Sequence, residues 1–322
     1  MESIGLLLEC DQGRLKEANF GMAALVDRDQ DQQGVAIVVN ASIGEIRATL
    51  AAHGISRILH IHTTGPDGNP AYRASAIAAA MERFAIKSLV GLTSPEGREL
   101  LPRIAALLDA PLIMDCIDID LGSHRVRTSQ YSGKTIATIN LQGSHFLYGL
   151  RPNVIEPRKK TVDAKVLDFT FEEKAPREYR LVETRTQHNG TPHLAEAQVI
   201  FAGGRGMKNG ENFDLLFACA RRLNASVGAS RVAVDNGWVP YAMQVGQTGS
   251  KVNPRVYLAF GISGSVQHFA GMKTAKTIIA VNSDENAAIL ANCDYYAIRD
   301  LFQILPALER ALARATEEYS SK

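Results

Sequence analysis

The stretch QVIFAGGRGMKNGENFDLLFACARRL, residues 198–223, decides the fold of the C-terminal half of the chain. It opens with an apolar run of strand length, continues through a glycine-rich turn and ends with apolar residues at helical spacing. A strand, a tight turn and a helix in this order form half of a βαβ unit, the unit from which parallel sheets are built. As a dinucleotide fingerprint the turn is imperfect, because Gly204-x-Gly206 is followed by Gly210, one residue later than GxGxxG requires. The turn therefore predicts either a phosphate site at a helix N-terminus or a plain glycine turn.

The same alternation continues to the C-terminus. Within the C-terminal half we predict strands at residues 198–202, 231–234, 256–260 and 277–281, and helices at 212–223, 265–270 and 300–315. Residues 236–253 have no periodic pattern, and a loop of this length inside a compact domain is usually functional. Gln244, Gln247 and Thr248 in this loop suit hydrogen bonding to a planar or polar ligand.

The N-terminal half shows a second set of alternating elements. We predict strands at residues 4–9, 35–39, 58–62, 88–92, 112–117 and 166–171, with helices between them. Ser94 followed by Pro95 marks the N-cap and first residue of one helix. The polar segment 183–192 contains Asn189-Gly190 and predicts a linker, so we expect an N-terminal α/β domain at 1–189 and a second domain at 190–322. The fold class is α/β, with two domains of mainly parallel sheets, the C-terminal one Rossmann-like.

Composition excludes several functional classes. The 322 residues carry 35 Lys and Arg against 34 Asp and Glu, a net charge of +1, which does not fit a nucleic-acid-binding protein. The apolar runs are too short for a transmembrane segment, and the N-terminus has no signal-peptide pattern, so we expect a cytoplasmic protein. The four cysteines lack the spacing of a zinc site.

Two further groups of residues are ambiguous from the sequence alone. GISGSVQH, residues 261–268, follows a strand and opens a helix, so Ser263 and free backbone N–H groups could bind an anion, although a lone histidine such as His268 is more often structural. His60 and His62 alternate along a strand and share one face, but no carboxylate or third histidine accompanies them at a supporting spacing. We assign no metal ligand.

Six motifs in the C-terminal half, in the same order, closely resemble the α subunit of electron transfer flavoproteins. They are GGRGMKNGENF (203–213), VGASRVAVDNGWVP (227–240), QVGQTG (244–249), GISGSVQHFAGM (261–272), IAVNSDENAAIL (279–290) and RDLFQILP (299–306). The N-terminal half resembles the family more weakly, chiefly through GRELLPRIAALLDAPLIMD (97–115).

The resemblance implies a heterodimer. The C-terminal domain would bind one FAD, and a separate β subunit would pack on this chain's N-terminal domain and hold AMP or a second FAD. Such a protein is an electron carrier rather than an enzyme. It takes electrons from flavin dehydrogenases, typically the acyl-CoA dehydrogenases of fatty acid β-oxidation, and passes them to a quinone reductase or another acceptor through an anionic flavin semiquinone.

The resemblance also implies residue roles. Arg205 would contact the FAD phosphates, Ser230 and Arg231 would lie near the isoalloxazine, and Thr248 would face N5 from a loop that clasps the flavin. His268 would reach the flavin O2. The full set of expected cofactor-binding residues is Arg205, Ser230, Arg231, Gln244, Val245, Gly246, Gln247, Thr248, Ser263, Gly264, Ser265, Val266, Gln267, His268, Asn282, Asp300 and Leu301, the last three around the ribose and adenine. Ser265 stands where the family usually has alanine, and Asn236 where many relatives have a small residue.

Arg231, Thr248 and His268 are the residues expected to tune the flavin potential. A flavin that gains negative charge needs cations and donors around it. One full charge at about 4 Å and an effective dielectric of about 20, halved for solvent exposure, contributes about 2 kcal/mol, or roughly 90 mV for a one-electron couple. We expect Arg231 and His268 to supply this charge.

Two other functions fit the sequence. One is a flavin-bifurcating form, which oxidises NADH through a flavin in the β subunit and whose distinguishing residues lie mainly in the β chain. The other is a non-redox nucleotide-binding scaffold. The scaffold gives no reason for Arg231, Thr248 and His268 to occur together.

Overall fold

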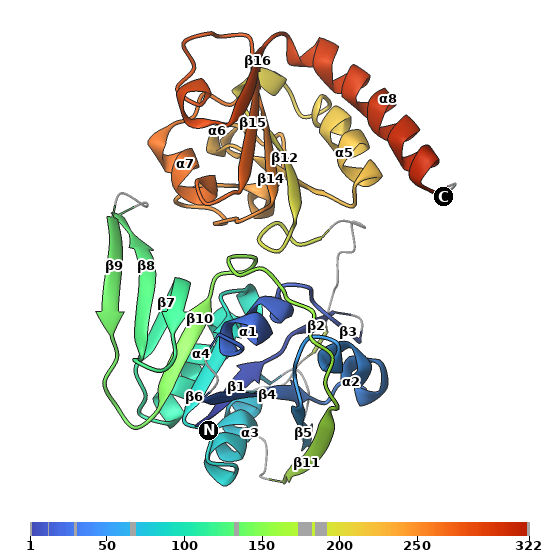
Figure 1. Ribbon diagram of the computed structural model, residues 1–322. Coiled ribbons are helices and arrows are strands. Elements are labelled where there is room, and N and C mark those ends of the chain that lie inside the picture. Colours follow the sequence, from blue (N-terminus) through green and yellow to red (C-terminus); the bar gives the residue numbers. More distant parts are fainter. Residues whose placement is uncertain are drawn as a thin grey trace. The chain divides into compact units, whose positions relative to one another are not determined.

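The computed structural model describes residues 2–11, 13–28, 31–64, 69–131, 135–172, 182–183 and 192–320 (Figure 1). The chain divides into two compact units, residues 1–186 and 187–322, each with its own sheet and core. The expected boundary after residue 189 lies outside the described residues and stays a prediction.

The first unit is built on a nine-stranded mixed sheet with the strand order β11-β5-β4-β1-β6-β10-β7-β8-β9. Strands β11 to β7 of this order pair in parallel, and β7, β8 and β9 form an antiparallel extension. The strands are β1 (Glu2–Leu7), β4 (Gln32–Val39), β5 (Arg57–Thr63), β6 (Ser88–Leu92), β7 (Leu112–Asp120), β8 (Arg125–Gln130), β9 (Thr135–Asn140), β10 (Phe146–Leu150) and β11 (Lys165–Phe171), and the separate pair β2 (Cys10–Asp11) and β3 (Arg14–Leu15). The helices are α1 (Asn19–Val26), α2 (Ile43–Ala51), α3 (Pro70–Arg83) and α4 (Pro95–Leu107).

Alternate residues of the strands enter the cores on the two faces of this sheet. On β5, Ile58 belongs to the core that α1 and α2 cover, whereas Leu59 and Ile61 belong to the core of α3 and α4. The six strands predicted for this half are confirmed, as is the helix at Ser94, whose Oγ accepts a hydrogen bond from the Gly97 N–H at 3.0 Å. Strands β8, β9 and β10 were missed. The β10 strand is as fully buried as the predicted β6, but unlike β6 it is not followed by a segment with helical spacing.

The second unit has a five-stranded, all-parallel sheet in the order β13-β12-β14-β15-β16. Its strands are β12 (Val199–Gly203), β13 (Ser226–Ala229), β14 (Val256–Phe260), β15 (Thr277–Asn282) and β16 (Tyr295–Ile298). Its helices are α5 (Phe213–Arg222), α6 (Arg231–Asp235), α7 (Val266–Met272) and α8 (Leu301–Ser320), with 3-10 turns η2 (Arg205–Met207), η3 (Tyr241–Met243) and η4 (Leu290–Asn292). Helices α5 and α8 lie together on one side of this sheet (Figure 1), where Leu216 and Leu305 share a core, and Met272 of α7 belongs to a second core.

The predicted strand at residues 231–234 is wrong. These residues form α6, and the strand, β13, lies just before them. Val232 and Val234 are β-branched and mimic a strand pattern, but the Ser230 Oγ accepts a hydrogen bond from the Ala233 N–H and caps a helix instead. The other strands and helices predicted for this half are confirmed, and the four-residue edge strand β16 was missed.

Two glycine-rich turns of the second unit touch each other. The Gly204 N–H donates to the Phe260 carbonyl at 2.9 Å, and the Gly206 N–H donates to the Gly261 carbonyl at 3.0 Å. A Cβ atom on Gly204 would lie 2.3 Å from the Gly261 oxygen, so no side chain fits there. The turn after β12 is thereby fixed against the turn after β14.

No helix in the described part of the chain is long and apolar enough to cross a membrane.

Candidate functional site

A cavity of about 850 Å³ opens at the carboxyl ends of the strands of the second unit. The chain runs from β12 to β13 on one side, then passes back to β14 on the other side of β12. This reversal makes the ends of β12 and β14 a topological switch point, the place where open parallel sheets bind ligands. The cavity is lined by residues that follow each of the five strands.

Fifteen of the seventeen residues expected to bind a cofactor line this cavity. They are Arg205, Ser230, Arg231, Gln244, Val245, Gly246, Gln247, Thr248, Ser263, Ser265, Gln267, His268, Asn282, Asp300 and Leu301. Gly264 and Val266 do not line it. Gly264 has a φ of +82°, and a Cβ there would lie 2.4 Å from the Ile289 nitrogen, so its role is to shape the turn. The Val266 side chain is exposed.

Sequence reasoning missed several lining residues. They include Lys208, Asp235, Ile262, Ser283, Asp284, Ala287 and Phe302. Asp284 had a usable signal, because it comes two residues after the end of a parallel strand, where the cavity of such a sheet opens. Lys208 stood inside the quoted glycine-rich turn, and its ammonium lies 4.8 Å from the centre of the Phe302 ring.

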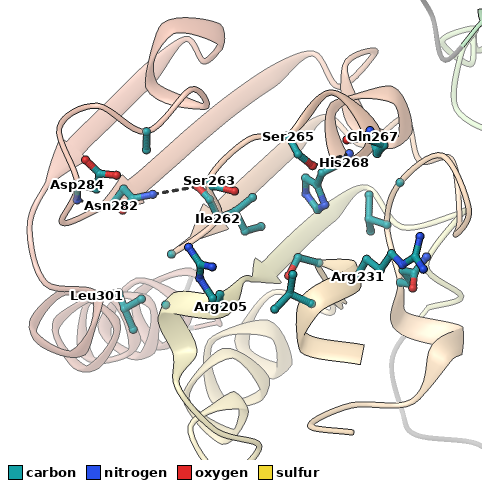
Figure 2. Close-up of a pocket in the computed structure, with 18 of the residues that line it drawn as sticks. Arg205, Arg231, Ile262, Ser263, Ser265, Gln267, His268, Asn282, Asp284 and Leu301 are labelled. Carbon is teal, nitrogen blue, oxygen red and sulfur yellow. Dashed lines mark hydrogen bonds between the residues drawn. The ribbon is translucent and has the colours of Figure 1, made fainter. Parts of the chain in front are cut away.

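One end of the cavity combines cations with hydrogen-bonding groups. Figure 2 shows Arg205, Asn282, Asp284 and Leu301 at this end. Arg205 is exposed and makes no ion pair with the residues that the structure describes. The Asn282 Nδ2 donates to the Ile262 carbonyl at 2.9 Å, which ties the end of β15 to the turn after β14. A free arginine beside fixed backbone suits a phosphate group.

At the other end, a tightly bonded loop covers the cavity wall. Gln244 Nε2 donates to Thr248 Oγ1 at 2.9 Å, and the Gln247 N–H donates to the Gln267 carbonyl at 2.8 Å. Gly271 lies against the loop so closely that a Cβ would be 2.4 Å from the Gly246 nitrogen. The loop that sequence analysis interpreted as functional is therefore fixed on α7 beside the cavity.

His268 is the main buried titratable group of the cavity. Its side chain is directed into the cavity (Figure 2), its Nε2 lies 3.0 Å from the Tyr257 hydroxyl, and its Nδ1 has no hydrogen-bond partner among the described residues. Burial lowers the pKa of His268 to about 4, against a smaller opposing effect of the Val245 backbone. The imidazole is therefore neutral at pH 7 in this structure, and its charge beside a bound flavin stays a prediction.

The electrostatic effect of Arg231 inside the cavity is weaker than that of an unpaired charge. It is the first residue of α6, its side chain is 68% exposed, and its Nε lies 3.2 Å from Asp235 Oδ2. The neighbouring carboxylate and the solvent both reduce the field of its guanidinium inside the cavity. We therefore expect its effect on a bound flavin to be tens of millivolts, below the roughly 90 mV derived for a half-screened, unpaired charge.

Comparisons with known proteins match both units of the chain to the same protein family. Residues 7–173 match the model of the electron transfer flavoprotein domain, and residues 193–273 match the electron transfer flavoprotein FAD-binding domain. The chain is 39% identical over 228 residues to an electron transfer flavoprotein subunit alpha of Pseudomonas aeruginosa, covering 67% of this chain and 70% of that protein.

Two longer alignments agree. A probable mitochondrial electron transfer flavoprotein subunit alpha of Caenorhabditis elegans is 35% identical over 86% of this chain and 83% of its own length. An electron transfer flavoprotein subunit alpha of Syntrophomonas wolfei is 28% identical over 98% of this chain and all of its own length. Among solved structures, Acinetobacter baumannii MurG aligns with 99% of this chain and 95% of its own at a TM-score of only 0.32 and 9% identity, which carries no argument.

The low pKa of His268 predicts a pH-dependent stability. The unfolded chain takes up the proton near pH 6.5 and the folded unit only near pH 4, so the free energy of unfolding falls as the pH drops between these values, by about 3 kcal/mol in total. We expect His268→Gln to remove this part of the pH dependence, measured by urea unfolding of the FAD-free chain between about pH 7 and 4.5. An unchanged difference between the two pH values in the variant would contradict the neutral, buried assignment.

Proposed function

The chain belongs to the electron transfer flavoprotein family as an alpha subunit with an FAD-binding domain, and we propose that it carries electrons between flavin dehydrogenases and a separate acceptor. The observation that carries the proposal is the meeting of six separate segments around one cavity. Fifteen residues that the family pattern assigns to the flavin, scattered from Arg205 to Leu301, line that cavity. A scaffold without redox turnover gives no reason for this set.

The residues present fit FAD. Its pyrophosphate is anionic, and Arg205 and Lys208 lie at the end of the cavity where Asn282 and Asp300 can meet ribose hydroxyls. His268 lines the opposite end, together with Arg231 and the loop of Gln244. Hydrogen-bonding side chains at this end suit the polar edge of the flavin ring.

The protein residues would orient the ring and set its electrostatics. When bound, FAD supplies one-electron and two-electron redox chemistry, and the protein supplies position and charge. The loop of residues 244–249 is fixed on α7, so Thr248 Oγ1 is held at the cavity wall by Gln244 Nε2. Arg231 favours negative charge on the ring, and His268 borders the same end of the cavity.

The pathway is part of the proposal. We expect a β subunit that packs on the first unit and holds AMP or a second FAD, donors such as acyl-CoA dehydrogenases, and a quinone reductase or similar acceptor in the cytoplasm. The family membership supports these partners. In this assignment the chain relays electrons one at a time and converts no substrate of its own.

Arg205 tests the cofactor assignment. The chain purified with its β subunit is expected to be yellow, and Arg205→Ala is expected to weaken FAD binding by about tenfold, because a charge-assisted phosphate contact contributes about 1.5 kcal/mol or more. FAD retained after dialysis is measured by absorbance and flavin fluorescence. Arg221→Ala, which removes an exposed arginine of α5 outside the cavity, is the control and should retain FAD fully. A colourless wild-type protein, or equal retention in both variants, would contradict the proposal.

Arg231 tests the electrostatic role separately from binding. We expect Arg231→Ala to keep its FAD and to lower the potential of the first one-electron step by tens of millivolts, while Arg231→Lys keeps most of the wild-type value because it keeps the charge. Potentiometric titration of the three proteins gives the values. An unchanged couple in Arg231→Ala would remove Arg231 from the redox role.

A further inference from the structure

The first unit contains a group of metal-binding side chains that the proposed function does not use. His60 and His62 of β5 and Asp168 of the edge strand β11 place one ligand atom each within 4.8 Å of one another. The sequence showed only the histidine pair, because Asp168 follows His62 by 106 residues.

The pairing of the two strands brings these residues together. In the parallel register of β5 and β11, Asp168 stands directly opposite His60. Side chains alternate along a strand, so His62, two residues after His60, lies on the same face. Backbone hydrogen bonding of the sheet therefore fixes all three Cα positions before any ligand binds.

The distances already approach those of a metal site. Asp168 Oδ1 lies 2.8 Å from His62 Nε2 and 3.3 Å from His60 Nδ1, and the two imidazole ring centres are 4.0 Å apart. In a tetrahedral zinc site with bonds of about 2.0–2.1 Å, neighbouring ligand atoms lie about 3.3 Å apart. Side-chain rotations alone would bring three donors onto one ion.

The three side chains are accessible and carry the right chemistry. The exposed fraction rises from 12% at His60 to 45% at His62 and 65% at Asp168, so the group is open to solvent on its outer side. Neutral imidazole and ionised carboxylate are the forms that bind metals.

We propose that His60, His62 and Asp168 bind a divalent transition-metal ion, with Zn²⁺ the best match. Two imidazoles and one carboxylate, with water in the fourth position, are a donor set that zinc accepts, whereas Mg²⁺ and Ca²⁺ prefer oxygen ligands throughout. The bound ion would cross-link the edge strand β11 to β5. This site is separate from the cavity of the second unit and does not depend on the FAD assignment.

Isothermal titration of Zn²⁺ tests the site, using the full chain purified with its β subunit and freed of metal by chelation. We expect the wild-type chain to bind one Zn²⁺ ion saturably. Asp168→Asn and His62→Gln should each lose this ion or bind it at least about tenfold more weakly, because loss of even an outer-shell partner lowers metal affinity about 10–100-fold. Zinc-edge X-ray absorption of the wild-type complex should show imidazole ligands at about 2.0–2.1 Å. Mg²⁺ should give no saturable binding.

A matched variant separates ligation from surface charge. Asp163 is an exposed aspartate close in sequence to Asp168, and its carboxylate pairs with Arg47 at 3.5 Å. Asp163→Asn removes this carboxylate and should bind Zn²⁺ like wild type. Circular dichroism and FAD content confirm that each variant is folded. The proposal is overturned if wild type shows no saturable Zn²⁺ site, or if Asp168→Asn and His62→Gln bind Zn²⁺ as well as Asp163→Asn does.

Discussion

The contact between the turn after β12 and the turn after β14 sets the geometry of the second unit. Gly204 and Gly206 lie against Gly261 at distances that leave no room for a Cβ, and two backbone hydrogen bonds join the turns. Because these strands are neighbours at the switch point of the sheet, the position of their turns decides where the cavity opens. Arg205 lies in the first of these turns and Ser263 in the second, so both line the cavity beside this junction.

Much of this arrangement could be predicted because it is written in local patterns. Strands with alternating or β-branched residues, glycines after them and capped helices predicted the α/β class and two mainly parallel sheets. Local patterns failed at β10, a short buried strand with no helical pattern after it, and where Val232 and Val234 resembled a strand although Ser230 starts a helix. The pairing of β5 with β11 could not be predicted, because no residue near His60 and His62 in the sequence indicates that Asp168 lies opposite them.

Resemblance supplied residue identities but not their charge states. His268 was expected to be a cation beside the flavin, whereas burial next to Tyr257 lowers the pKa of its imidazole in this structure. Arg231 keeps its charge, but its ion pair with Asp235 and the surrounding solvent screen that charge. We therefore expect the cavity to stabilise an electron-rich flavin through several hydrogen-bond donors and the screened guanidinium of Arg231. The loop of residues 244–249 holds part of this set in place.

The central claim is that FAD occupies the cavity at the switch point and contacts segments from both sides of it. Amide hydrogen exchange, measured on the chain with its β subunit before and after removal of FAD, tests this claim most directly. The account predicts slower exchange with FAD in residues 203–208, 244–249 and 261–268 and unchanged exchange in β8 and β9 of the first unit. Equal exchange in residues 203–208 and 261–268 with and without FAD would contradict it.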